Sequence, residues 1–313
     1  MTKIMNFLKL AIACITCFTV QINSASAQWP PAGIVGNGTA ASPWEITTIQ
    51  HLMALAAYVN NGNGSSTATK HYKLMNDIAY NFVPSSTKGW SPIGNNVTDG
   101  ATFQGNFDGN GKKVTNIAIN RDAASYVGLF GHVSSAYIHD LGVEISQMFI
   151  GGQYVGITGN QYVGGLIGRA DNSTIENCYV IGTGNITGTS DVGGLVGFSF
   201  SSVIRNSYAI CDVSGSVVGG FVGANNGTII DCYATGNITG TSYTGGFVGS
   251  NKVGGSIAYC YATGDVSTTG SYVGGLAGEN QSGTAIRNCV AAGIYFVRIT
   301  TDIEVATKKI VKQ

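Results

Sequence analysis

The 313-residue chain has few charged residues and few prolines, and it has no long apolar run after its N-terminal segment. Charged residues make up 10% of the sequence, with 16 Lys and Arg against 16 Asp and Glu, so no basic patch is available for nucleic acid. No later segment has the ~18 apolar residues of a membrane span. In contrast, 46 residues are Gly, and Thr, Ser, Asn, Val and Ile are abundant. This composition is typical of turn-rich β structure and nearly excludes long helices.

The N-terminal segment, residues 1–27, has the pattern of a secretory signal peptide. Lys3 and Lys9 precede an apolar run over residues 10–20, and small residues at 25–27 form a cleavage site. We expect cleavage after Ala27, which leaves 14 Lys and Arg against 16 Asp and Glu. The predicted location is outside the cytoplasm, either secreted or on the outer cell surface.

A Val-Gly-Gly type of motif recurs along the second half of the chain. Its glycine pairs begin at Gly164, Gly193, Gly219, Gly245 and Gly274, so the steps between successive copies are nearly constant at 29, 26, 26 and 29. A unit of this size is too short to fold alone and must bury its apolar face against its neighbours. The spacing therefore predicts a solenoid, one elongated body that grows by adding coils.

A short segment after each motif, with six positions, predicts a corner between two strands. Copies start at residues 175, 204, 229, 257 and 286, with Ile first, Asn or Asp mostly third, and Cys or Ser fourth. Ile and Cys are three positions apart, whereas two inward side chains of one strand are separated by an even number of positions. We expect the corner at the third position, because Asn tolerates the left-handed conformation. After the corner, Cys should point inward and the following Tyr outward.

With a further short strand before the next motif, each coil would contain three strands. Coils stacked in register then form an all-β, right-handed parallel β-helix, with the hand taken from the general crossover rule. Apolar residues at helical spacing in segment 49–60 predict a short amphipathic helix that caps the N-terminal end. We expect Trp29, Trp44 and Trp90 to pack in this cap region. A duplicated Gln-Tyr-Val-Gly, at 153–156 and 161–164, suggests a loop insertion on one coil.

The repeats resemble the GLUG motif family, which is named for a Gly-Leu-apolar-Gly core. That core is present at residues 165–168, 194–197 and 275–278, and Phe replaces Leu at 221 and 247. The resemblance covers roughly residues 101–292. It implies a bacterial surface or secreted protein, adhesin-like or flanking an immunoglobulin-cleaving metallopeptidase, with no catalytic group in the repeat itself.

The last residues are similar to the final strands of the type IX secretion sorting domain of Bacteroidetes-type bacteria. The Gly-Ile-Tyr at 293–295 and the Lys-Lys-Ile-Val-Lys at 308–312 carry this likeness. It implies contact with the secretion machinery, although the first strands of that domain are replaced here by the last coil. The chain is therefore divided into a signal peptide (1–27), a cap with first coils (28–125), GLUG-type repeats (126–292) and a partial sorting tail (293–313).

No motif of known catalytic or metal-binding chemistry stands out. The four histidines include no His-Glu-x-x-His. Segment 106–111 resembles the start of a calcium loop, but Ile117 stands where that loop needs Glu. Cys178, Cys232, Cys260 and Cys289 share one ladder position, and Cβ atoms of adjacent coils would be about 4.8 Å apart, which favours free thiols over disulfides. We expect no cofactor, no metal and no catalytic residue.

Outward tyrosines are the best binding candidates. One expected stripe contains Tyr179, Tyr208, Tyr233 and Tyr261, and a broken second one contains Tyr126, Tyr162, Tyr243 and Tyr272. The rings would either stabilise adjacent coils by about 0.5–1.5 kcal/mol per pair, or form a platform for a glycan or a host or microbial surface protein. We predict a non-enzymatic, adhesin-like binding or structural module. The alternatives are an accessory region of a surface peptidase, or a polysaccharide-cleaving β-helix enzyme. Such an enzyme would need clustered acidic and basic residues, whereas charges here number one or two per coil.

Overall fold

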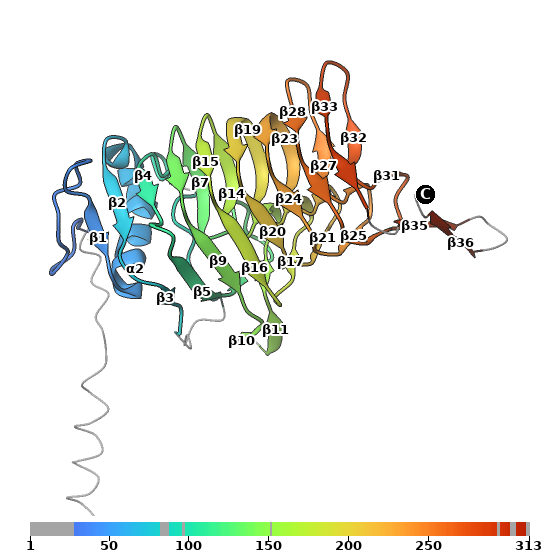
Figure 1. Cartoon of the computed structure of the whole chain (residues 1–313). Helices are drawn as coiled ribbons and strands as arrows, with labels where there is room; N and C mark the ends of the chain where they lie inside the picture. The colour runs from blue at the N-terminus through green and yellow to red at the C-terminus, as the bar shows by residue number, and fades with distance from the viewer. Residues whose placement is uncertain are drawn as a thin grey trace, which may run out of the picture.

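The computed structural model describes residues 28–81, 88–95, 98–150, 152–292, 295–300 and 305–310. The predicted signal peptide lies outside the described residues. Parallel strands stack coil upon coil into a β-solenoid of about eight turns, which runs from the blue N-terminal end to the red C-terminal end in Figure 1. The predicted all-β fold with parallel stacking is confirmed.

Four parallel sheets run along the solenoid. Sheet A contains β1 (Trp44–Ile46), β2 (His71–Leu74), β4 (Asn106–Asp108), β7 (Phe130–Ser134), β8 (Tyr137–His139), β14 (Ile167–Asp171), β15 (Thr174–Glu176), β19 (Val196–Arg205), β23 (Val222–Ile230), β27 (Val248–Asn251), β28 (Ser256–Ala258), β32 (Ala277–Asn280) and β33 (Ala285–Arg287). Sheet B contains β3 (Ile78–Ala79), β5 (Lys113–Ile117), β9 (Gly142–Ile145), β16 (Tyr179–Gly182), β20 (Tyr208–Ile210), β24 (Tyr233–Ala234), β29 (Tyr261–Ala262) and β34 (Val290–Ala291).

Two further sheets close the coil. Sheet C contains β6 (Ile119–Asn120), β12 (Ile157–Thr158), β17 (Ile186–Thr187), β21 (Val213–Gly215), β25 (Ile238–Gly240), β30 (Val266–Thr268), β35 (Tyr295–Thr300) and β36 (Val305–Ile310). Sheet D contains β13 (Gln161–Gly164), β18 (Ser190–Gly193), β22 (Val218–Gly219), β26 (Tyr243–Gly245) and β31 (Tyr272–Gly274). The prediction of three strands per coil was therefore wrong, because the glycine motif itself forms the strands of sheet D and the start of sheet A.

Glycine is required where sheet D bends into sheet A. A Cβ atom on Gly164 would lie 2.3 Å from the carbonyl oxygen of Ile167, and one on Gly193 would lie 2.1 Å from that of Val196. The same clash, at 2.0–2.3 Å, recurs at the first glycine of the other three motifs. Real Cβ atoms do not approach an oxygen this closely, so only glycine fits the bend. This steric demand explains why the motif repeats.

The strand register confirms the predicted intervals and the predicted corner. Ile167 pairs with Val196, and the ladder continues to Val222 and Val248. The third position of each corner segment adopts a left-handed conformation, with φ between 51° and 55° at Asn177, Asn206, Asp231, Tyr259 and Asn288. Inward Ile and Cys side chains flank this corner and are buried, as at Ile229 and Cys232.

The N-terminal end is capped as predicted. Helix α2 (Ile49–Tyr58) begins after Thr48, whose side chain accepts a hydrogen bond from the amide of His51, and Leu52 and Leu55 are fully buried. A short π-helical turn (Val59–Asn63) and a 3-10 turn (Gly64–Thr67) follow. Trp44 and Trp90 are buried and Trp29 packs against the same core, so the prediction that these residues pack is confirmed.

One hairpin and the tail depart from the regular coil. The predicted insertion forms an antiparallel hairpin of β10 (Met148–Ile150) and β11 (Gln153–Val155), which projects from the body in Figure 1. In the tail, β35 continues sheet C by pairing with β30, and β36 pairs back on β35 in antiparallel fashion.

Candidate functional site

The predicted tyrosine stripe exists on the outer side of sheet B. Tyr179, Tyr208, Tyr233 and Tyr261 follow one another in register. Their ring centroids are 5.1, 4.8 and 4.8 Å apart, and neighbouring planes differ by only 3–6°. The four rings therefore form a continuous stack along the solenoid axis.

Stacking covers the ring faces of the interior tyrosines of this stripe, whereas the last ring, Tyr261, is 41% exposed. Each interior ring has a neighbour on both sides, and the first ring, Tyr179, lies over Gly142 of the preceding coil. A Cβ atom on Gly142 would be 2.3 Å from Cζ of Tyr179, so glycine makes room for the ring. Only edges and hydroxyl groups of the interior rings face outward, which suits stabilisation of the coils better than stacking of a sugar ring.

The second stripe is broken into two pairs, as predicted. Tyr126 and Tyr162 have centroids 5.0 Å apart, and Tyr243 and Tyr272 have centroids 4.7 Å apart. In the two coils between these pairs, the equivalent positions precede Val192 and Val218 and are occupied by Asp191 and Val217.

Two phenylalanines that the sequence analysis did not single out extend the first pair. Phe198 lies 5.8 Å from Tyr162 and 6.3 Å from Phe200, and Phe200 is 40% exposed. We call Tyr126, Tyr162, Phe198 and Phe200 the aromatic row. Neighbouring ring planes in the row differ by 24–56°, so the rings do not form a closed stack.

Cationic side chains lie among the rings of the aromatic row. The guanidinium carbon of Arg169 is 5.5 Å from the ring centroid of Tyr162 and 5.2 Å from that of Phe198. Lys252 places Nζ 4.9 Å from the Phe198 centroid. Asp171 pairs with Arg169 at 2.8 Å. The result is a mixed aromatic and cationic surface, a composition found at binding sites.

Carboxylates beside the row differ in their ionisation. Burial opposes ionisation of Asp171, but hydrogen bonds from His132 and Arg169 outweigh this effect and lower its pKa. Burial raises the pKa of Asp191, and the opposing effect of the positive charges of Lys252 and Arg169 is smaller.

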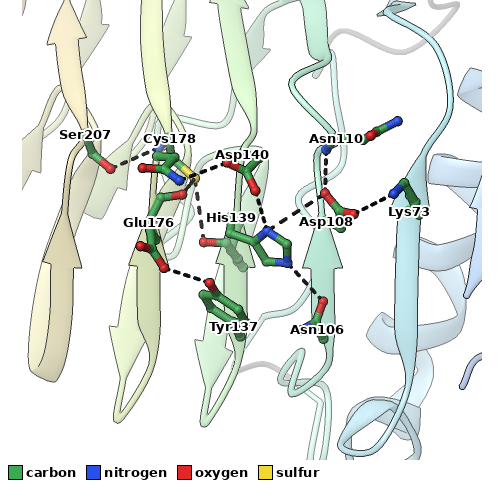
Figure 2. A network of polar contacts seen from close by, with 12 residues as sticks. Lys73, Asn106, Asp108, Asn110, Tyr137, His139, Asp140, Glu176, Cys178 and Ser207 are labelled. Atoms are coloured by element: carbon green, nitrogen blue, oxygen red, sulfur yellow. Dashed lines mark hydrogen bonds and ion pairs between the residues drawn. The ribbon is translucent and has the colours of Figure 1, made fainter. Parts of the chain in front are cut away.

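A network of polar side chains occupies the outer side of sheet A in the N-terminal coils (Figure 2). Lys73 pairs with Asp108 at 3.2 Å, and Nδ1 of His139 lies 2.8 Å from Asp140 and 3.8 Å from Asp108. The amide of Asn177 donates to Asp140 at 2.9 Å. Hydrogen bonding from His139 lowers the pKa of Asp140.

The network continues across the next coils. Glu176 accepts a hydrogen bond from Tyr137 at 2.7 Å and pairs with Arg205 at 2.8 Å, and these contacts lower its pKa. In register along sheet A, the outward side chains are Glu45, Lys73, Asp108, His139, Glu176 and Arg205. We call this series the charge ladder, because acidic groups alternate with basic groups or histidine.

These contacts correct the expectation that charges are scattered. The charges are indeed one or two per coil in sequence, but register brings five of them, together with His139, onto one face of sheet A. A cleft of about 510 Å³ opens beside the ladder, lined by Glu45, His71, Asn106, Asp108 and His139 among others. Donor atoms of Asp108, His139 and Asp140 lie within 4.8 Å of one another, close enough to share a metal ion. Asp108 and Asp140 already have hydrogen-bond or ion-pair partners in the protein, so the three side chains also form a stable cluster without a metal ion.

The cysteines of the described residues are free thiols, as predicted for the ladder. Cys178 and Cys232 are buried and donate to the carbonyl oxygens of Glu176 and Ile230, at 3.2 and 3.1 Å. Burial raises the pKa of Cys178 and of Cys211 to about 12. Cys178 and Cys211 are therefore part of the packed interior, where burial disfavours the thiolate.

Comparison with known proteins supports the repeat class. The family model described as "The GLUG motif" matches residues 159–187, 214–239 and 240–267, so GLUG repeats are present in this chain. Halomucin of Haloquadratum walsbyi is 35% identical over 162 residues, which is 45% of this chain and 2% of halomucin. A Gly-rich membrane protein of Evansella cellulosilytica is 34% identical over 146 residues, which is 45% of this chain and 15% of that protein. The chain thus corresponds to a small part of each relative.

Solved structures share the fold. A crystal structure described as an immunoglobulin A1 protease from Bacteroides ovatus matches with a TM-score of 0.52 and 20% identity, over 84% of this chain and 69% of that chain. A structure described as IgA1 protease matches with a TM-score of 0.51 and 16% identity, over 85% of this chain and 22% of that chain. At these identities the likeness establishes the β-solenoid fold alone. Within the described residues, no helix is long and apolar enough to cross a membrane.

Proposed function

We propose that the protein is a non-enzymatic, adhesin-like module of a bacterial cell surface that binds a glycan through the aromatic row. The observation that carries this proposal is the arrangement around Arg169. The rings of Tyr162, Phe198 and Phe200 lie 5.2–6.0 Å from its guanidinium carbon, and Phe200 is 40% exposed. Tilted, partly exposed rings offer faces to a sugar ring, and neighbouring cations offer hydrogen-bond donors.

The proposed surface location is supported by the two ends of the sequence. A signal-peptide pattern over residues 1–27 and a sorting-like tail over residues 293–313 are consistent with export and delivery by the secretion machinery. The matches to parts of much longer proteins also fit an accessory binding segment beside a peptidase or other surface domain. In either arrangement the solenoid would hold the aromatic row away from the cell envelope.

A glycan array tests the proposal with two multiple variants. Tyr162→Ser with Phe200→Ser opens the aromatic row, and Tyr208→Ser, Tyr233→Ser and Tyr261→Ser together remove most of the tyrosine stripe. We expect the row variant to lose about tenfold or more in glycan affinity while its melting temperature changes little. If the row variant binds glycan as the wild type does and only the stripe variant loses binding, the glycan site would be at the hydroxyl groups of the tyrosine stripe.

A second candidate function is polysaccharide cleavage in the cleft beside the charge ladder. The specific observation is the triad of Asp108, His139 and Asp140, of which Asp108 and His139 line the cleft and Asp140 lies beside them. The lowered pKa of Asp140 makes it a weak general base, which counts against this function. Release of reducing ends from acidic or neutral polysaccharides, abolished by His139→Ala, would favour the enzyme over the binding module.

A further inference from the structure

A hollow of about 160 Å³ lies at the start of the aromatic row. Its lining includes Ser91, Asn95, Arg121, Ser125 and Tyr126. Arg121 is the one charged residue of this lining, and no carboxylate belongs to it. Tyr126 belongs both to the hollow and to the aromatic row, so the two features are continuous.

Arg121 has an unusual environment for a half-buried arginine. Its Nε atom donates to the carbonyl oxygen of Trp90 at 3.2 Å, and its backbone amide donates to Thr158. Among the described residues, no carboxylate forms an ion pair with Arg121. The segments 82–87 and 96–97, which lie outside the described residues, contain no Asp or Glu. The adjacent Asp122 is exposed, and its carboxylate accepts the amide of Ala123.

A cation withdrawn from water without a counter-charge is destabilising, and here burial lowers the pKa of Arg121. The other arginines with resolved shifts, Arg169 and Arg205, are each paired with a carboxylate at 2.8 Å. The planar guanidinium matches the geometry of an oxyanion with two parallel hydrogen bonds. Ser91 and Ser125 can add hydroxyl donors from the same lining.

We propose that this hollow binds an oxyanion, the carboxylate or sulfate of an acidic polysaccharide, with Arg121 as its principal contact. A water molecule occupies about 30 Å³ of liquid, so the hollow has room for one anionic group and its first carbon atoms but not for a chain of sugars. The attached sugar would then extend over Tyr126 toward Tyr162. This choice of glycan class rests on the proposed function, whereas the oxyanion site itself does not.

Titration calorimetry of the full chain with three polymers tests the site. Alginate supplies carboxylates, dextran sulfate supplies sulfates, and neutral dextran supplies neither. We expect Arg121→Gln to weaken binding of one or both acidic polymers by about tenfold or more. Arg287→Gln removes the same charge from an exposed position on the last coil, and this control should keep affinity within about twofold of the wild type.

Two further variants separate binding from folding. Arg121→Lys keeps the positive charge but loses the planar guanidinium that can form two parallel hydrogen bonds. Its affinity for acidic polymers should therefore lie between those of Arg121→Gln and the wild type. Ser125→Asp places a carboxylate in the hollow, and it should abolish binding of acidic polymers without lowering the melting temperature. Two results would overturn the site. One is equal binding of neutral dextran and alginate. The other is binding of alginate and dextran sulfate that both Arg121→Gln and Ser125→Asp leave unchanged. Neutral-glycan binding that depends on Tyr162 and Phe200 would still leave the proposed function standing.

Discussion

The tyrosine stripe and the aromatic row lie on the same solenoid but are built differently. The stripe repeats one residue type in register, with ring planes within 3–6° of each other. The aromatic row mixes Tyr and Phe, tilts its rings by 24–56° and surrounds a cation. The end rings of both surfaces are partly exposed, Tyr261 of the stripe by 41% and Phe200 of the row by 40%, so the two surfaces differ in ring geometry and in the cation and not in exposure. In this solenoid the regular ladder of rings stabilises the stack, and the irregular aromatic row is the surface that we propose for a partner.

The largest expected effect tests the register on which this comparison depends. Ile229 is fully buried and Ile230, the next residue, faces outward. Ile229→Asp buries a carboxylate without a partner and should cost several kcal/mol, about enough to unfold adjacent coils. Ile230→Asp should cost well under about 1 kcal/mol. Similar shifts in the urea midpoint for the two variants would contradict the inward and outward assignments.

The next effect separates the stability roles of the two aromatic surfaces. Replacing Tyr208, Tyr233 and Tyr261 by Ser removes three ring contacts of the stripe, which should cost about 1.5–4.5 kcal/mol in total. The double change of Tyr162 and Phe200 to Ser should cost less, because these rings do not form a closed stack. Chemical denaturation of both variants measures the difference. A row variant that loses more stability than the stripe variant would reverse the comparison.

A smaller effect concerns a tyrosine that belongs to neither surface. Tyr259 occupies the left-handed corner position with φ of 55° and is 60% exposed, while equivalent corners have Asn or Asp. Tyr259→Asn should raise stability by about 0.5–1 kcal/mol, because Asn adopts this conformation at lower cost. The reverse change at the matching corner, Asn206→Tyr, should lower it by a similar amount. Thermal melting with no gain for the first variant would show that the Tyr259 ring makes compensating contacts.

The smallest effect concerns the charge ladder. Arg205 and Tyr137 lower the pKa of Glu176 from its ordinary value of 4.5, so the folded state favours the carboxylate. This contribution is present above the unfolded pKa and is lost as pH falls through the lower folded pKa. Arg205→Gln should therefore flatten the loss of stability below pH 4.5 and raise the Glu176 pKa in an NMR titration. The same titration with Arg287→Gln, which lies far from Glu176 along sheet A, should show no change.

Much of the coil was predictable because local chemistry determines it. The odd step between Ile229 and Cys232, with Asp231 between them, required a corner, and the structure has a left-handed residue there. The outward tyrosines followed from the two-residue period of a strand. The fourth sheet was missed because Val-Gly-Gly has the composition of a turn, and only the clash at the Gly164 bend explains it.

The candidate sites were less predictable, because they form between coils. Phe198 and Phe200 stand where other coils have small or polar residues, and this departure was the available signal. Their approach to Arg169 depends on the length of the intervening coil, which places Arg169 opposite Phe198. Likewise Asp108 and His139 belong to different coils, and register alone makes them neighbours. Arg121 gave no signal at all, since a missing counter-charge is visible only in three dimensions.

The charge ladder also bears on how the first coils find their proper order, since the later repeats carry Ile230 and Ala258 at this position. A nascent chain could skip one of these coils and still turn its apolar side chains inward. Such a mispairing would bring Glu45 beside Asp108 and Asp108 beside Glu176, and like charges directly opposite are destabilising. Only the consecutive arrangement sets Lys73 against Asp108 and Arg205 against Glu176. The alternation therefore disfavours a skipped coil in this part of the solenoid, through side chains that lie outside the packed interior.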